Sequence, residues 1–114
     1  MPKPSENIEI HTFVDASAEA YAACAYLRCT INNRVHVKLI AAKSRVAPIK
    51  PLSIPRLELQ AAVLGTRLTE TIRNELRLNI TRQVMWSDSQ KVLLWITTHQ
   101  KAPFIAHRIG EIWW

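Results

Sequence analysis

The pattern of apolar and polar positions predicts three strands in the first part of the chain. Residues 8–15 alternate between apolar and polar side chains, and residues 20–30 form an apolar run without turn residues. Residues 35–44 alternate again after the segment INNR, which is typical of a hairpin turn. Because the connections between these segments are short, we expect a three-stranded antiparallel meander.

The apolar period changes to steps of three and four residues after a proline-rich loop at positions 46–55. With Ser53 as its N-cap, the new period predicts an amphipathic helix of roughly 22–24 residues. Residues 82–88 predict a fourth strand, and residues 89–99 predict a short helix. Since strand, helix and strand form a crossover, the fourth strand should run parallel to a member of the meander.

The end of the chain has an apolar pattern that is compatible with a further helix at residues 104–114. The chain stops there on two tryptophans, which is typical of an end inside a domain. We therefore divide the chain into a polar N-terminal segment, residues 1–7, and one C-terminally truncated α/β domain, residues 8–114. Its predicted architecture is a mixed sheet with a long crossover helix.

Composition agrees with a single globular domain, because 48% of the 114 residues are hydrophobic and 21% are charged. The presence of only two glycines excludes a glycine-rich phosphate loop. No run approaches the ~20 apolar residues of a membrane helix, and residues 1–9 contain no signal-peptide core. We therefore expect an intracellular protein, cytoplasmic or nuclear, without a membrane partner.

The net charge of +6 is unevenly distributed along the chain. No acidic residue occurs between Glu19 and Glu58, whereas this interval contains several cations. Such asymmetry favours contact with a polyanion such as nucleic acid, although a solvated basic face would give the same pattern. The cations are Arg28, Arg34, Lys38, Lys43, Arg45, Lys50 and Arg56.

Three carboxylates stand at the ends of predicted elements. Asp15 ends the first strand, Glu58 lies in the first turn of the long helix, and Asp88 ends the fourth strand. If the first and fourth strands are parallel neighbours, Asp15 and Asp88 meet at one edge of the sheet. Clustered carboxylates repel each other and suit Mg²⁺, and two such ions can promote cleavage of a phosphodiester. Taken singly, each acid could instead be structural, through hydrogen bonds or the helix dipole.

The ordered segments carry a family resemblance. FVDAS, a hairpin, AAKSRVAPIKPLSIPRLELQAAVLG, MWSDSQKVLLWI and FIAHRIGEI together resemble the RNase H domain of a BEL/Pao-type retrotransposon Pol polyprotein, over about residues 10–112. The resemblance implies an RNase H-like fold and an endonuclease that hydrolyses the RNA strand of RNA–DNA hybrids with Mg²⁺ or Mn²⁺. It implies that Asp15, Glu58 and Asp88 are the catalytic, metal-binding acids. It also implies reverse transcriptase and other polyprotein domains as partners.

One departure from the family pattern concerns a fourth acid, which the family places after a fifth strand and near a last helix. The only acid after Asp88 is Glu111, so we expect the fifth strand and the last helix to be missing. The two-ion site would then be incomplete, and the fragment weak or inactive. A non-catalytic nucleic-acid-binding module and a structural module of the polyprotein remain as alternative functions.

Five further residues are candidates for contact with nucleic acid. Ser17 and Ser89 closely follow two of the acids and could bind a phosphate, or could instead cap a helix or stabilise a turn. The other three belong to the basic interval and are Lys43, Arg45 and Arg56.

Overall fold

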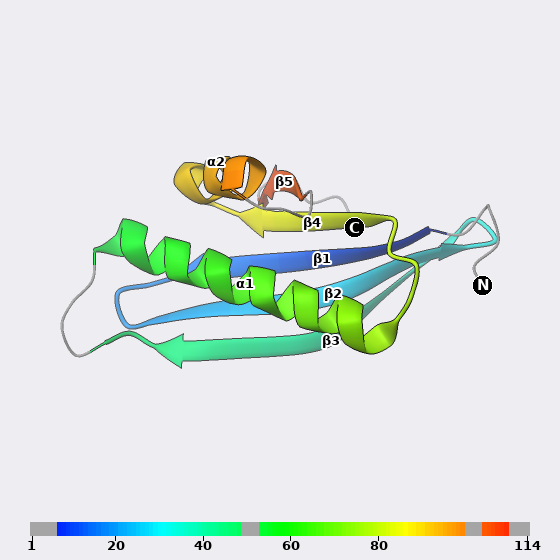
Figure 1. The fold of residues 1–114 in the computed structure, drawn as a ribbon, viewed down its shortest axis with the longest axis horizontal. Coiled ribbons are helices and arrows are strands. Elements are labelled where there is room, and N and C mark those ends of the chain that lie inside the picture. Colours follow the sequence, from blue (N-terminus) through cyan, green and yellow to red (C-terminus); the bar gives the residue numbers. More distant parts are fainter. Residues whose placement is uncertain (1–6, 49–52, 100–103, 110–114) are drawn as a thin grey trace.

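The computed structural model describes residues 7–48, 53–99 and 104–109. They form a mixed sheet with strand order β3-β2-β1-β4-β5 and two helices (Figure 1). This arrangement confirms the predicted meander, crossover helix and parallel fourth strand. The elements are β1 (Asn7–Ala16), β2 (Ala20–Ile31), β3 (Arg34–Val46), α1 (Ile54–Leu76), β4 (Arg82–Ser87), α2 (Gln90–His99) and β5 (Ile105–Arg108).

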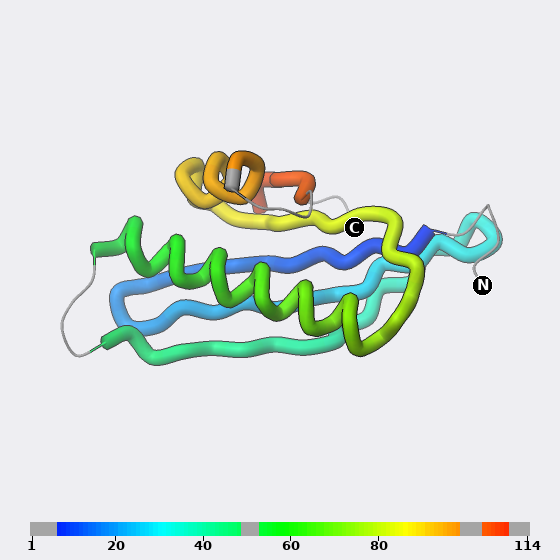
Figure 2. Tube along the Cα trace, viewed as in Figure 1, coloured from blue at the N-terminus to red at the C-terminus, as the bar shows by residue number. Residues whose placement is uncertain are grey.

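The strand pairing brings the first and fourth strands together. β1 pairs antiparallel with β2 and parallel with β4, in a register that joins Glu9 to Arg82 and Phe13 to Trp86. The ribbon and the tube, drawn from the same side, place the β1–β2 turn, the start of α1 and the β4–α2 connection at the same end of the molecule (Figures 1 and 2). The carboxyl ends of β1 and β4 therefore lie beside the first turn of α1.

The expectation that the fifth strand is missing is wrong. Residues 105–108 form β5, which pairs parallel with β4 from Val84 opposite Ile105 to Ser87 opposite Arg108. The helical pattern inferred for 104–114 is therefore wrong for these four residues, while residues 110–114 lie outside the described part of the chain. Four residues, of which only Ile105 and Ala106 are apolar, contain no period that separates a strand from a helix, so the pairing with β4 determines the structure here.

A β-bulge divides β3 into two parts that face opposite ways. Ala25 of β2 pairs with Ala41, but the next residue, Tyr26, pairs with Leu39. The extra residue, Ile40, reverses the orientation of the side chains that precede it. The alternation predicted for residues 35–44 therefore does not keep one face. Val35, Val37 and Leu39 are exposed and lie on the face away from α1.

Both helices contribute to one hydrophobic core on a single face of the sheet. Ile10 and Val14 of β1, Leu68 of α1 and Ile96 of α2 belong to the same buried cluster. Gly65 allows α1 to approach β1 closely, because a Cβ atom there would lie 2.5 Å from Cγ1 of Val14.

The ends and the middle of α1 explain its position. Ser53 has extended backbone at the N-cap, as predicted, but its side chain makes no capping hydrogen bond. Arg77 adopts the left-handed conformation at the C-cap. In the middle, Thr12 and Thr69 are buried and join through their Oγ1 atoms at 2.6 Å, and Thr69 also donates to the Gly65 carbonyl. This bond fixes α1 against β1.

Candidate functional site

A cleft of about 190 Å³ opens where β1 and β4 end beside the first turns of α1. It brings together the three carboxylates expected from the sequence, one each from β1, from α1 and from the residue that follows β4. The residues around the cleft are Val14, Asp15, Ala16, Glu58, Ala61, Ser87, Asp88 and Ser89. The arrangement depends on the parallel pairing of β1 with β4, because this pairing directs both strand ends to one edge.

The three acids differ in their surroundings. Asp15 is exposed, and its Oδ1 accepts a hydrogen bond from the backbone N–H of Ala16 at 2.9 Å. Glu58 is half-buried, and Asp88 is exposed. Asp15 and Asp88 also border a larger hollow of about 520 Å³, so they stand on the rim between two openings. Lys43 lines the larger hollow together with these two acids, whereas no lysine, arginine or histidine lines the smaller cleft among the described residues.

The donor set suits a hard cation, because carboxylate oxygens are the ligands that Mg²⁺ prefers. Within residues 7–48, 53–99 and 104–109, however, no three Asp, Glu, His or Cys side chains stand close enough to form a ready metal site. Carboxylates repel one another without a cation between them, and the bond from Ala16 to Asp15 holds one oxygen to the backbone. The three side chains are therefore of the type that binds such a cation, and they lie around one cleft. Their carboxylate groups do not converge on a single point.

The other predicted contact residues fall into separate places. Ser89 lines the cleft, and its Oγ accepts the backbone N–H of Val92 in the first turn of α2. Ser17 lies in the β1–β2 turn, where its Oγ donates to the carbonyl of Ala20. The three basic candidates are absent from the cleft lining: Lys43 and Arg45 border a groove between β3 and α1, and Arg56 is exposed in the first turn of α1.

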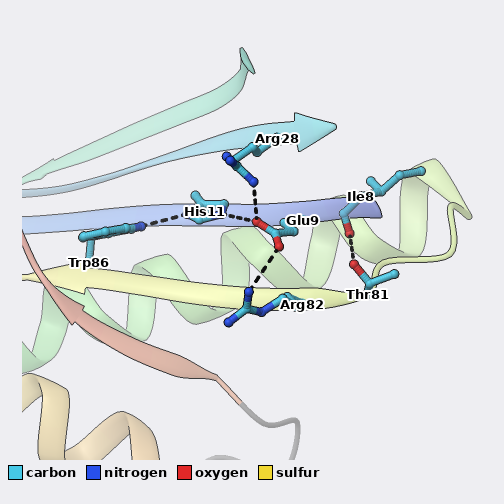
Figure 3. Close-up of polar contacts among 7 residues, drawn as sticks. All are labelled: Ile8, Glu9, His11, Arg28, Thr81, Arg82 and Trp86. Carbon is cyan, nitrogen blue, oxygen red and sulfur yellow. Dashed lines mark hydrogen bonds and ion pairs between the residues drawn. The ribbon is translucent and has the colours of Figure 1, made fainter. Parts of the chain in front are cut away.

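A polar network around the buried Glu9 and His11, on the face away from α1, supports the strand pairing (Figure 3). The Glu9 carboxylate accepts a hydrogen bond from His11 Nε2 at 2.8 Å and lies 3.4 Å and 3.6 Å from the guanidinium groups of Arg28 and Arg82. On its other side, His11 Nδ1 accepts the indole N–H of Trp86 at 2.9 Å. We call these five residues the Glu9 network. It joins β1 to β2 and to β4, so it supports the register that aligns the ends of β1 and β4.

The network determines the protonation of His11. The indole of Trp86 can only donate, so Nδ1 of His11 carries a lone pair and the proton resides on Nε2. Burial lowers the pKa of His11 from its ordinary value of 6.5, and this effect outweighs the opposite influence of Glu9. His11 is therefore neutral when it connects Trp86 to Glu9.

The sequence pattern identified none of these roles. It placed Glu9 and His11 on one face of a predicted strand and Trp86 inside another, and each would be an ordinary surface or core residue. The informative signal is the register, since Glu9 is opposite both Arg28 and Arg82. A single sequence does not reveal which residues of two strands face each other.

The comparison with protein families matches residues 1–89, which include all three acids, to the Pao retrotransposon-like RNaseH-like domain. The chain belongs to this family. None of the curated proteins matches the domain. Two solved structures resemble it over 90% of its length and 85% of theirs. LC11-RNase H1 in complex with an RNA/DNA hybrid is 10% identical with a TM-score of 0.52, and RNase H1 from Halobacterium salinarum is 7% identical with a TM-score of 0.50.

These two likenesses confirm that the chain has an RNase H-like fold. At 10% and 7% identity, the likeness concerns the arrangement of the chain. In the part of the chain that the structure describes, the helices lack the length and apolar character needed to cross a bilayer.

Proposed function

We propose that this RNaseH-like domain hydrolyses the RNA strand of RNA–DNA hybrids with the help of divalent metal ions. The observation that carries the proposal is the cleft in which carboxylates from β1, from α1 and from the end of β4 meet, with no lysine, arginine or histidine in its lining among the described residues. Family membership and the RNase H-like fold support it.

In this proposal, Asp15, Glu58 and Asp88 hold Mg²⁺ or Mn²⁺. A bound pair of such ions supplies an activated water and stabilises the charge on the leaving oxygen of the phosphodiester. The protein contributes the orientation of the carboxylates. Asp15 and Asp88 are held by paired strands, and Glu58 by a helix anchored through Thr69.

The proposed substrate is a nucleic acid because the chain carries a net charge of +6, which favours a polyanion. One solved neighbour is an RNase H1 in complex with an RNA/DNA hybrid, which makes a hybrid the first substrate to test. We further propose that the domain works beside a reverse transcriptase and other domains of a Pol polyprotein.

The family pattern includes a fourth acid, which it places after the fifth strand. Glu111 is the only acid after Asp88 in the sequence, and it lies outside the described residues. We expect the set of three acids to give weak cleavage, because a site with fewer carboxylates holds a second cation less well.

The test is cleavage of a hybrid whose RNA strand is labelled, at high protein concentration with Mg²⁺ or Mn²⁺. We expect cut RNA, intact DNA, and a loss of about 100-fold or more in Glu58→Gln, since metal-dependent stabilisation amounts to several kcal/mol. Glu70→Gln is the matched control, because Glu70 is exposed on α1 and does not line the cleft.

The second candidate function is a non-catalytic module that binds nucleic acid. The observation that favours it is the absence of a ready three-ligand metal site among the described residues. Salt-sensitive binding of the hybrid without any cut RNA, in both metals, would support this alternative and would overturn the catalytic proposal.

A further inference from the structure

A second groove, of about 190 Å³, lies on the helix-covered side of the sheet between α1 and the last residues of β3. Its lining is mixed, with Leu64 and Leu68 of α1 among the apolar residues and Gln60 and Thr71 among the polar ones. Three exposed cations border it, two from β3 and one from α1: Lys43, Arg45 and Arg67. We call it the basic groove.

The path of α1 explains why the groove is open. The helix crosses the sheet diagonally, so that its first half lies away from β3 and its last turns approach that strand (Figure 1). β3 is the edge strand of the sheet. Lys43 and Arg45 lie opposite Ala23 and Tyr21 of β2 in the register, which directs them to the α1 side of the sheet.

The positive charge of the groove is uncompensated within the described part of the chain. No acidic residue lines the groove there, and none lies within ion-pair distance of Lys43, Arg45 or Arg67. Nη1 of Arg45 donates a hydrogen bond to the backbone carbonyl of Ser44 at 3.1 Å. The guanidinium has five N–H groups, so others remain to donate to an anion. Three like charges along one groove form a site that an anion would stabilise.

The groove and the acid cleft lie on opposite flanks of α1. Glu58 borders the cleft and Arg67 borders the groove. Nine residues of helix separate them, which corresponds to roughly 180° around the helix and ~14 Å along it. Arg67 is therefore held apart from Glu58, at a distance that spans several phosphates of a nucleic-acid strand, whereas Lys43 also lines the larger hollow that Asp15 and Asp88 border.

We propose that the basic groove binds backbone phosphates of a nucleic acid at a point outside the acid cleft. The proposal rests on the proposed function, because it assumes that the domain binds a hybrid. The groove positions the duplex by charge and carries no sequence information, as is usual for phosphate contacts. Arg67 follows Glu58 and so lies outside the acid-free interval of the sequence, which is why the charge pattern did not indicate this role.

The experiment measures binding of a fluorescent RNA–DNA hybrid by anisotropy without divalent metal, between about 50 and about 200 mM salt. The groove variant combines Lys43→Gln, Arg45→Gln and Arg67→Gln. The charge-matched control combines three exposed cations that do not line the groove, in Arg34→Gln, Lys38→Gln and Arg77→Gln. A third protein exchanges the groove cations with Lys43→Arg, Arg45→Lys and Arg67→Lys, and thermal unfolding checks that all variants fold.

The slope of log K against log salt is negative, and we expect its magnitude to decrease by roughly 2–3 in the groove variant. This corresponds to about 0.9 for each phosphate that the protein no longer neutralises. The control should show less than half of that decrease, and the exchanged protein should keep the original slope. Equal slopes in the groove variant and the control would overturn the groove proposal and leave the proposed function standing. A wild-type protein without salt-sensitive hybrid binding would instead contradict the proposed function itself.

Discussion

Gly65→Ala tests how closely α1 approaches the strand that carries Asp15. The added methyl group would lie 2.5 Å from Cγ1 of Val14 and 3.2 Å from Cγ2 of Thr12. Both neighbours are β-branched, so they have little freedom to move aside. The helix must therefore shift away from β1, and Val14, which immediately precedes Asp15, lines the cleft.

The expected magnitude combines two opposing effects. Overpacking of a core costs typically about 1–3 kcal/mol, whereas alanine is favoured over glycine in a helix interior by about 1 kcal/mol. Gly65→Ala should therefore lower the free energy of unfolding by up to about 2 kcal/mol. In a Val14→Ala background the closest clash is gone, so the same change should stabilise by up to about 1 kcal/mol.

Urea unfolding of the four proteins in this cycle measures both effects, because the midpoint and the slope together give the free energy of unfolding. The sign of the Gly65→Ala effect should reverse between the two backgrounds. If Gly65→Ala stabilises the wild type as much as it stabilises the Val14→Ala protein, then α1 does not approach β1 as described.

Two further predictions concern buried polar groups. Because the pKa of folded His11 lies below its ordinary value of 6.5, the unfolded chain binds the proton first. Stability should therefore be lost as the pH falls below about 6.5 towards the folded pKa, and urea unfolding against pH should show a weaker loss in His11→Gln. Thr69→Val leaves the buried Thr12 hydroxyl without its partner and should cost about 1–3 kcal/mol, while adding Thr12→Val should recover part of that cost in the same assay.

The parts of the fold with strong periods could be predicted from the sequence. The change from alternation to steps of three and four residues located α1, and the crossover rule required a parallel β4. The common location of the three acids could also be predicted, because each acid lies at the end of one of these elements. Asp15, Glu58 and Asp88 line one cleft as that reasoning requires.

The remaining features depend on contacts between distant residues. β5 is too short for its own pattern and is defined by its pairing with β4. The bulge at Ile40 and the ion pairs of Glu9 follow from strand register, which pattern alone does not determine. Arg67 joins Lys43 and Arg45 only because of the angle at which α1 crosses the sheet.

If Asp15, Glu58 and Asp88 act together as one metal site, as proposed, each of them contributes to the binding of a divalent cation. The most direct test of this proposal is Mn²⁺ binding, followed by electron paramagnetic resonance, to the wild type and to Asp15→Asn, Glu58→Gln and Asp88→Asn, with Glu70→Gln as the control. We expect saturable Mn²⁺ binding in the wild type and the control, and much weaker binding in each of the three cleft variants. Equal Mn²⁺ binding in all five proteins would contradict the proposal.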